Sequence, residues 1–205
     1  MLTVAIQAGG ESKRMGQDKG LVPFQGQPLI VRVLNRVAAI ADELVITSNQ
    51  PESYRFLGLS PVSDRQPGRG ALGGLYTALD AAHQLAVAVV ACDMPFVNPL
   101  LLAFQLQMLN ETGADVVIPR TADGLEPFHA IYRRDTCLPQ VRAALQYNQR
   151  RVDAWFPLVK VHELNPEDIQ PYDPLGLAFL NVNTPEELQR AEEIARTRPT
   201  AKEEL

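Results

Sequence analysis

The sequence predicts an α/β protein with an open, mostly parallel sheet and helices on both of its faces. Three observations support this fold class. Short β-branched runs alternate along the chain with longer helical patterns. Residues 86–91 form an uninterrupted apolar run, which is typical of a strand covered on both faces. The polar, glycine-rich segment 8–19 follows the first strand directly, where open α/β sheets bind their ligands.

Individual elements follow from the spacing of apolar residues. Strands are expected over the short apolar runs at residues 2–6, 43–47, 86–91, 115–118, 127–133 and 179–182. Helices are expected where apolar residues recur on one face, at residues 28–40, 72–83, 98–110, 136–147 and 184–196. Asn98 and Thr184 are the expected caps of the third and last helices, because each precedes a proline. The proline-rich and acidic region 152–174 gives no clear pattern.

Length and composition limit the class of protein. The chain has 205 residues and a net charge of −5, which predicts one domain over residues 1–197 and a mobile tail over 198–205. The acidic balance argues against broad binding to nucleic acid or to an anionic membrane. Two cysteines are too few for a disulfide framework or a cysteine zinc site. We therefore expect a cytoplasmic protein without a membrane anchor, and a monomer.

Residues 7–19 carry the strongest functional pattern. Glycines allow the backbone to approach a polyphosphate and to aim its N–H groups at it, and three cations lie within seven residues of the same segment. The combination predicts a triphosphate site, although neither G-x-x-x-x-G-K-[ST] nor G-x-G-x-x-G is present. A solvated surface loop is the alternative interpretation.

A single acid follows the apolar run at residues 86–91. Asp93 lies just past this strand, where a desolvated carboxylate is costly unless it is paired or bound to a metal. Mg²⁺ is bound by one or two carboxylates together with substrate phosphates, so Asp93 is the expected metal ligand. The alternative is an aspartate that only caps the turn before the next helix.

From Ala8 to Lys19 the chain resembles the A-G-G-x-S-x-R-M-G-x-D-K signature of molybdenum cofactor guanylyltransferases. These enzymes belong to the nucleotidyltransferases with a Rossmann-like, twisted sheet, and a small antiparallel element is expected with that fold. The resemblance spans about residues 2–196. Residues 93–95 resemble the metal-binding D-x-P segment of this family, residues 70–75 its G-P-L-x-G segment, and residues 181–188 its closing N-x-N-T-P-E-E-L pattern.

The resemblance implies transfer of GMP from GTP to the terminal phosphate of molybdenum-molybdopterin, with release of pyrophosphate and with Mg²⁺ as cofactor. It assigns the α-phosphate to Lys19, the β- and γ-phosphates to Arg14, and the metal to Asp93. Gln7 stands beside the base pocket, where the family usually has leucine, and Thr47 stands where it uses asparagine. The implied nucleotide-binding residues are Gln7, Ala8, Gly9, Gly10, Ser12, Lys19, Thr47, Asp64 and Asp93.

Three residues are expected on the acceptor side of the site. Asn181 lies in the expected strand 179–182, and Asn183 follows directly after it. Because the two are two residues apart, their side chains would point to the same face of the strand. His129 lies on the strand that the resemblance places beside the acceptor pocket, although a core histidine fits this position equally well. Molybdoenzymes or their chaperones are left open as further partners.

Other functions were weighed against guanylyl transfer. Cytidylyl transfer to the same pterin is a near alternative, and nucleotidyl transfer to a sugar phosphate is a broader one. Gly9 and the closing N-T-P-E-E-L pattern favour the guanylyltransferase. A nucleotide-binding carrier without catalysis belongs to another class of protein, and Lys19 with Asp93 argues against it, because a carrier needs no transition-state cation.

Overall fold

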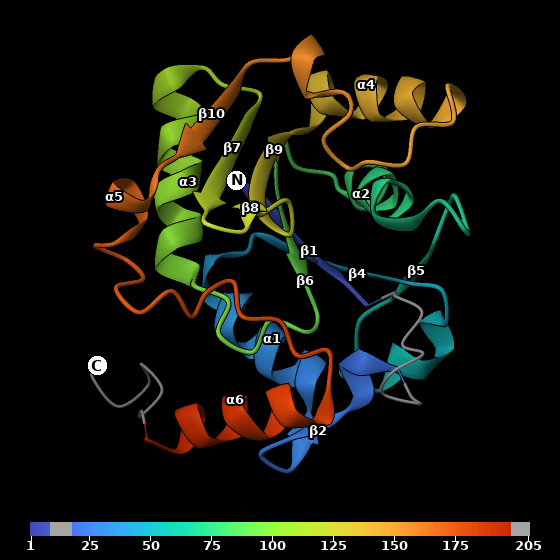
Figure 1. The fold of residues 1–205 in the computed structure, drawn as a ribbon. Coiled ribbons are helices and arrows are strands. Elements are labelled where there is room, and N and C mark those ends of the chain that lie inside the picture. The colour runs from blue at the N-terminus through green and yellow to red at the C-terminus, as the bar shows by residue number, and fades with distance from the viewer. Residues whose placement is uncertain (9–17, 198–205) are drawn as a thin grey trace.

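The computed structural model describes residues 1–8 and 18–197. Its main sheet has eight strands in the order β10-β7-β9-β6-β1-β4-β5, with β8 paired to β7 (Figure 1). A second, two-stranded sheet pairs β2 with β3. The strands are β1 (Leu2–Gln7), β2 (Pro23–Phe24), β3 (Gln27–Pro28), β4 (Glu43–Ser48), β5 (Val62–Ser63), β6 (Ala86–Ala91), β7 (Val116–Thr121), β8 (Gly124–Leu125), β9 (His129–Arg133) and β10 (Val161–Leu164).

Strand directions confirm the predicted fold class. Strands β6, β1, β4 and β5 are parallel to one another, and β10 is parallel to β7. Strand β9 runs antiparallel to both of its neighbours, β6 and β7. The pairs β7–β8 and β2–β3 are antiparallel as well. The sheet is therefore mixed and mostly parallel, with small antiparallel elements.

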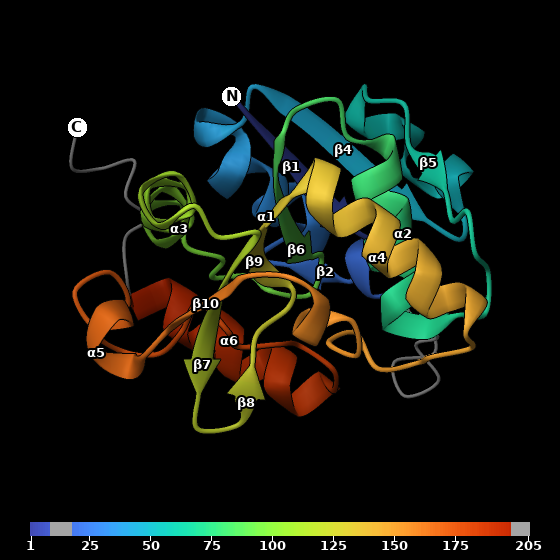
Figure 2. The same ribbon diagram turned by 90° about the horizontal axis from the view of Figure 1, so that it is seen from above.

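Helices cover both faces of this sheet (Figure 2). On one face α1 and α3 pack in a single apolar cluster with β1 and β6, and on the other face α2 and α4 form a second cluster. The α-helices are α1 (Leu29–Val37), α2 (Gly70–Ala81), α3 (Pro99–Thr112), α4 (Arg134–Gln146), α5 (Pro166–Ile169) and α6 (Pro185–Thr197). Four 3-10 helices connect them: η1 (Lys19–Leu21), η2 (Ala38–Ile40), η3 (Pro51–Leu57) and η4 (Phe156–Leu158).

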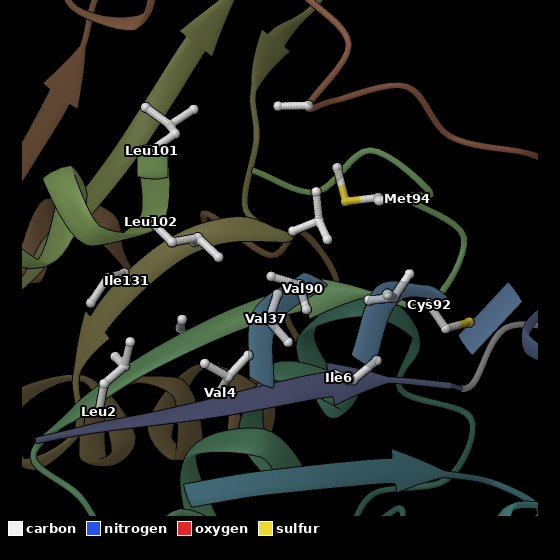
Figure 3. Packing of buried hydrophobic residues seen from close by; sticks show 14 of the residues in the cluster. Leu2, Val4, Ile6, Val37, Val90, Cys92, Met94, Leu101, Leu102 and Ile131 are labelled. Carbon is white, nitrogen blue, oxygen red and sulfur yellow. The ribbon is translucent and has the colours of Figure 1, made fainter. Parts of the chain in front are cut away.

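The alternation of side chains along β1 divides the core. Val4 and Ile6 point to the side of the sheet that α1 and α3 cover, where Val37 of α1 lies near Val4, and Leu101 of α3 belongs to the same cluster (Figure 3). Ala5 belongs to the opposite cluster, with α2 and α4. A third, smaller cluster joins α6 to β2 and to the segment that precedes α6; its buried members are Phe24, Leu29, Phe96, Val182, Ala191 and Ala195.

Both predicted helix caps are confirmed. The Asn98 side chain accepts hydrogen bonds from the N–H groups of Leu100 and Leu101 at 2.9 and 3.1 Å. Thr184 Oγ1 accepts from the N–H of Glu187 at 3.2 Å, at the start of α6. None of the helices in residues 1–8 and 18–197 combines the length and the apolar character that crossing a membrane requires.

The expected strand at residues 179–182 is wrong. This segment is irregular in the structure, because it pairs with no strand and instead runs across the loop that follows β6. A single backbone hydrogen bond, from Val182 N to Asp93 O at 2.9 Å, attaches it there. The sequence patterns also missed β10 and α5, both within the region that gave no clear pattern, as well as η3 and the β2–β3 hairpin.

Candidate active site

Three side chains from separate parts of the chain meet at the carboxyl end of β6. Lys19 Nζ donates a hydrogen bond to Asp93 Oδ2 at 2.8 Å and a second one to Asn183 Oδ1. Lys19 lies at the start of η1, Asp93 follows β6, and Asn183 precedes α6. The Lys19 side chain is 23% exposed and that of Asp93 is 12% exposed, so most of the ion pair is shielded from solvent.

The loop that carries Asp93 is held from two sides. Cys92 N donates to Gln7 O at 3.0 Å, which continues the pairing of β6 with β1. From α1, Arg32 Nε donates to Pro95 O at 2.8 Å and Arg36 Nε donates to Val97 O at 2.7 Å. These bonds hold the loop backbone on both sides of Asp93. The position of Asp93 therefore does not depend on the contacts of its own side chain alone.

Arg32 is itself enclosed by aromatic rings. Its guanidinium lies 4.9 Å from the ring centre of Phe24 and 5.5 Å from that of Phe96. Burial, with the neighbouring charge of Arg36, lowers the pKa of Arg32 to about 10. Arg32 therefore stays charged at neutral pH and remains a donor to the loop.

Asp18 and Tyr54 position Lys19. Asp18 caps η1 by accepting a hydrogen bond from Gly20 N at 3.1 Å, and it also accepts one from the Tyr54 hydroxyl. Tyr54 is fully buried, and this burial raises the pKa of its hydroxyl, which stays protonated and donating. A Cβ at Gly20 would lie 2.6 Å from the Tyr54 hydroxyl oxygen, so a glycine is needed where η1 crosses the ring.

The start of α6 positions Asn183. Glu187 Oε2 accepts hydrogen bonds from Asn183 N at 2.6 Å and from Thr184 N at 3.0 Å, in a capping box. The T-P-E-E pattern therefore also positions Asn183, the residue that contacts Lys19. Asn181 behaves differently: its amide donates to Phe179 O at 3.1 Å. Since the expected strand is absent, the argument that the two asparagines share a face no longer applies.

Other predicted nucleotide-binding residues lie at the neighbouring strand ends. Gln7 is paired in register with Thr47 of β4, and Ala8 N donates to Thr47 O at 2.7 Å. Asp64 follows β5, and its Oδ1 accepts from Thr77 Oγ1 of α2 at 2.8 Å. The structure thus brings Gln7, Ala8, Thr47 and Asp64 to the edge of the sheet that also carries Asp93. Their contacts with a nucleotide stay predictions.

His129 lies in the core. Its side chain is fully buried, and its Nε2 accepts a hydrogen bond from Asn98 N at 3.1 Å. The ring packs edge-on against Phe179 at a centroid distance of 5.2 Å. Burial lowers the pKa of His129 to about 4, so the ring is neutral. This geometry favours the core alternative over the expected contact with the acceptor.

The remaining predicted site residues lie in the glycine-rich segment. Gly9, Gly10, Ser12 and Arg14 fall outside the residues that the structure describes, as does the expected tail 198–205. The roles of Arg14 at the β- and γ-phosphates and of Gly9, Gly10 and Ser12 in nucleotide binding stay predictions.

The residues present suit a hard divalent cation. Within residues 1–8 and 18–197, no group of three or more His, Cys, Asp or Glu side chains is placed to hold a metal. Asp93 supplies one carboxylate, and the Asn183 amide oxygen lies nearby, because both accept a hydrogen bond from the Lys19 ammonium. One carboxylate with further oxygen donors is the arrangement that Mg²⁺ uses when substrate phosphates complete its shell.

Sequence patterns alone missed Tyr54 and Arg32, the two residues that support the site from behind. Tyr54 lies in a 3-10 helix that no periodicity predicts. For Arg32 a signal exists: Arg32 and Arg36 are four residues apart, so they share a face of the expected first helix. Nothing in the sequence says that this face meets the loop after β6.

Comparison with known proteins identifies the family. Residues 4–161 match the model of the MobA-like NTP transferase domain. A probable molybdenum cofactor guanylyltransferase from Pelotomaculum thermopropionicum is 34% identical, with 98% of this chain and 96% of that protein covered. A molybdenum cofactor guanylyltransferase from Syntrophotalea carbinolica is 31% identical over 92% of this chain and 89% of that protein.

Solved structures agree with this match. The crystal structure of molybdopterin-guanine dinucleotide biosynthesis protein A from Archaeoglobus fulgidus superposes with a TM-score of 0.83 at 28% identity, and covers 96% of this chain and 100% of that one. Membership of one family accounts for both the glycine-rich signature and the mixed sheet, and the Lys19–Asp93 pair lies beside that signature. The chain belongs to the MobA-like NTP transferase family, and it is a nucleotidyltransferase.

Proposed function

We propose that this chain transfers GMP from GTP to the terminal phosphate of molybdenum-molybdopterin, which yields the guanine dinucleotide form of the cofactor and pyrophosphate. The observation that carries the proposal is the cluster of Lys19, Asp93 and Asn183 beside the carboxyl end of β6. The names of the two relatives compared above, a probable molybdenum cofactor guanylyltransferase and a molybdenum cofactor guanylyltransferase, support the choice of nucleotide and acceptor.

The reaction needs no activated side-chain nucleophile. A phosphate monoester is already an anion near neutral pH, so its oxygen can attack the α-phosphorus directly. A new P–O bond forms, the bond from the α-phosphorus to the bridging oxygen breaks, and pyrophosphate leaves with that electron pair. Catalysis then depends on positioning and on neutralising negative charge. Lys19 is a suitable cation, because Asp93, Asn183 and the cap at Asp18 fix its position beforehand.

We propose Mg²⁺ as the metal, held by Asp93 with the amide oxygen of Asn183 nearby. When bound, the ion would neutralise charge on the phosphates. Other residues of the chain hold these two metal-binding residues in place. Arg32 and Arg36 fix the backbone of residues 92–97, which includes Asp93, and Glu187 fixes Asn183. Turnover should therefore stop when the metal is removed with a chelator and return when Mg²⁺ is added.

The test measures pyrophosphate and dinucleotide formed by the purified chain from GTP, Mg²⁺ and molybdenum-molybdopterin. Parallel reactions replace GTP with CTP, ATP or UTP, and replace the pterin with a sugar phosphate. We expect product only with GTP and the pterin. Faster reaction with CTP would support the cytidylyltransferase, and reaction with a sugar phosphate would support the broader alternative. Tight binding of GTP without any product would support a carrier and contradict the proposal.

A further inference from the structure

The side chain of Gln7 has a buried donor without a partner. Gln7 is the last residue of β1, and its Nε2 atom is buried and makes no hydrogen bond with any residue in the described part of the chain. A buried polar group that lacks a partner costs free energy, and most such groups in folded proteins are paired. An unpaired amide beside a candidate active site suggests that a ligand supplies the missing acceptor.

Gly74 of α2 makes room for this amide. A Cβ at Gly74 would lie 2.7 Å from Gln7 Oε1, so a larger residue there would displace the carboxamide from its present position. Gln7 points to the α2 face because Ala5, two residues earlier on β1, packs in the cluster of that face. The amide is therefore held between β1 and the first turns of α2.

The position of Gln7 within the edge of the sheet indicates which part of the nucleotide it faces. In register, Gln7 pairs with Ala91 of β6 on one side and with Thr47 of β4 on the other. Lys19 and Asp93, the groups suited to phosphates and metal, lie past the end of β6. A nucleotide that has its phosphates there and also contacts Asp64, a predicted nucleotide-binding residue beyond β5, would extend its nucleoside across β1 toward β4 and β5. An uncharged carboxamide between these points suits a base rather than a phosphate.

We infer that Gln7 determines base specificity by donating a hydrogen bond from Nε2 to the 6-keto oxygen of the guanine of GTP. The inference rests on the proposed function. Adenine has an amino group at position 6, so its N–H donors would face the Nε2 donor of Gln7 and no hydrogen bond could form. A keto group accepts the bond, and the buried amide gains the partner that it lacks. Gln7 thus contributes to the choice of a 6-keto purine over a 6-amino purine.

Three purine triphosphates separate this contact from the others that a base makes. GTP has the 6-keto and 2-amino groups, inosine triphosphate keeps only the 6-keto group, and 2,6-diaminopurine riboside triphosphate keeps only the 2-amino group. Dissociation constants are measured by competition, and kcat/KM with the pterin acceptor. For the unmodified chain we expect the diaminopurine nucleotide to be about 10- to 100-fold weaker than inosine triphosphate.

Two variants then test the residue. Gln7→Met keeps the length of the side chain but removes the donor, so GTP and inosine triphosphate should each weaken about tenfold while the diaminopurine nucleotide is unchanged. Gly74→Ala retains Gln7 but fills its space, so it should reduce the same discrimination. This substitution favours the helix, so the fold should persist.

Gln105 offers a matched control. Like Gln7, it has one buried side-chain atom without a partner in the described residues, Oε1, but it lies on α3, where its Nε2 donates to His129 O at 2.8 Å. Gln105→Met should lower stability and leave the ratio among the three nucleotides unchanged. This control separates loss of a buried amide from loss of base recognition.

The outcomes distinguish the inference from the function on which it rests. If Gln7→Met weakens all three nucleotides equally, the residue contributes only packing or a contact to the sugar, and the inference is wrong while the proposed function stands. The inference also fails if the unmodified chain accepts the diaminopurine nucleotide as well as inosine triphosphate. A chain that binds no GTP at all overturns the proposed function, and the inference with it.

Discussion

Asp93 and His129 lie near the same edge of the sheet, at the neighbouring strands β6 and β9, but their surroundings differ. Asp93 follows β6 and is nearly buried, with 12% of its side chain exposed and Lys19 as its counter-charge. His129 pairs in register with Val90 of β6, yet it is fully buried, and its Nδ1 has no partner among the described residues. Asp93 comes only three positions after Val90 in the chain. Closeness to the carboxyl end of a strand is therefore not enough to place a residue in an active site.

One segment accounts for the difference. Residues 178–183 cross this edge of the sheet, and Phe179 packs against the His129 ring. Four residues later, Asn183 completes the cluster with Lys19. The same crossing segment therefore shields the histidine and contributes Asn183 to the candidate site. The segment supplies a polar partner to the Lys19–Asp93 pair, whereas beside His129 it supplies an aromatic ring, and burial keeps that imidazole neutral.

The largest expected effect belongs to Asp93. Asp93→Asn keeps the size of the side chain and removes the charge that would hold a divalent metal, so turnover should fall by about 10³-fold or more. Rates are measured over a range of Mg²⁺ concentrations, with folding checked by circular dichroism. Asp115→Asn is the control, since Asp115 accepts from Lys160 N at 2.8 Å at the far end of β7. An unchanged rate at saturating Mg²⁺ would show that Asp93 only shapes the loop.

Lys19 should affect the rate more than the affinity. If it neutralises charge that develops on the α-phosphate, Lys19→Ala should lower kcat by about 10²–10³-fold and change KM little. Lys19→Arg should not restore the rate, because a forked guanidinium does not replace a compact ammonium between Asp93 and Asn183. Lys160→Ala, at an exposed lysine, should leave both constants unchanged. A variant that loses only affinity for GTP would make Lys19 a simple phosphate tether.

Tyr54 tests whether the position of Lys19 matters as well as its charge. Tyr54→Phe removes the hydroxyl that donates to Asp18, and the expected result is a kcat about tenfold lower with KM retained. Tyr132→Phe is a matched control, because the buried Tyr132 hydroxyl donates to Pro127 O at 2.8 Å, away from Lys19. Both variants should lose some stability, and only the first should lose rate. Equal kcat values in the two would mean that Asp18 holds η1 without Tyr54.

Much of this arrangement could be predicted from the sequence, and the missing parts share a cause. Buried strands, helix caps and Asp93 depend on local patterns, so residues 86–91, Asn98 and Thr184 behaved as expected. The strand expected at residues 179–182 failed because its apolar residues pack against the loop after β6 and α6, and not against another strand. Contacts such as Tyr54 with Asp18 join residues 36 positions apart, and no local pattern records them.

The smallest effect on catalysis, and the sharpest contrast with Asp93, concerns the pH dependence of stability. His129 has a pKa of about 4 in the folded chain, against about 6.5 for an exposed histidine. Between these values the unfolded chain binds the proton and the folded chain does not, so stability falls as the pH falls. Protonation would also remove the lone pair that accepts from Asn98 N. From pH 7 to pH 5 the free energy of unfolding should drop by about 2 kcal/mol from this residue.

Urea unfolding at a series of pH values measures this slope. His129→Gln removes the titrating group while an amide oxygen can still accept from Asn98 N, so the variant should lose less stability than the unmodified chain between pH 7 and pH 5. Should the variant fold poorly, the histidine resonances of the unmodified chain give the same information, since His129 should stay neutral until about pH 4. A His129 that titrates near pH 6.5 would show that its environment is open to solvent. The contrast with Asp93 would then disappear, and contact between His129 and the acceptor would again be the better interpretation.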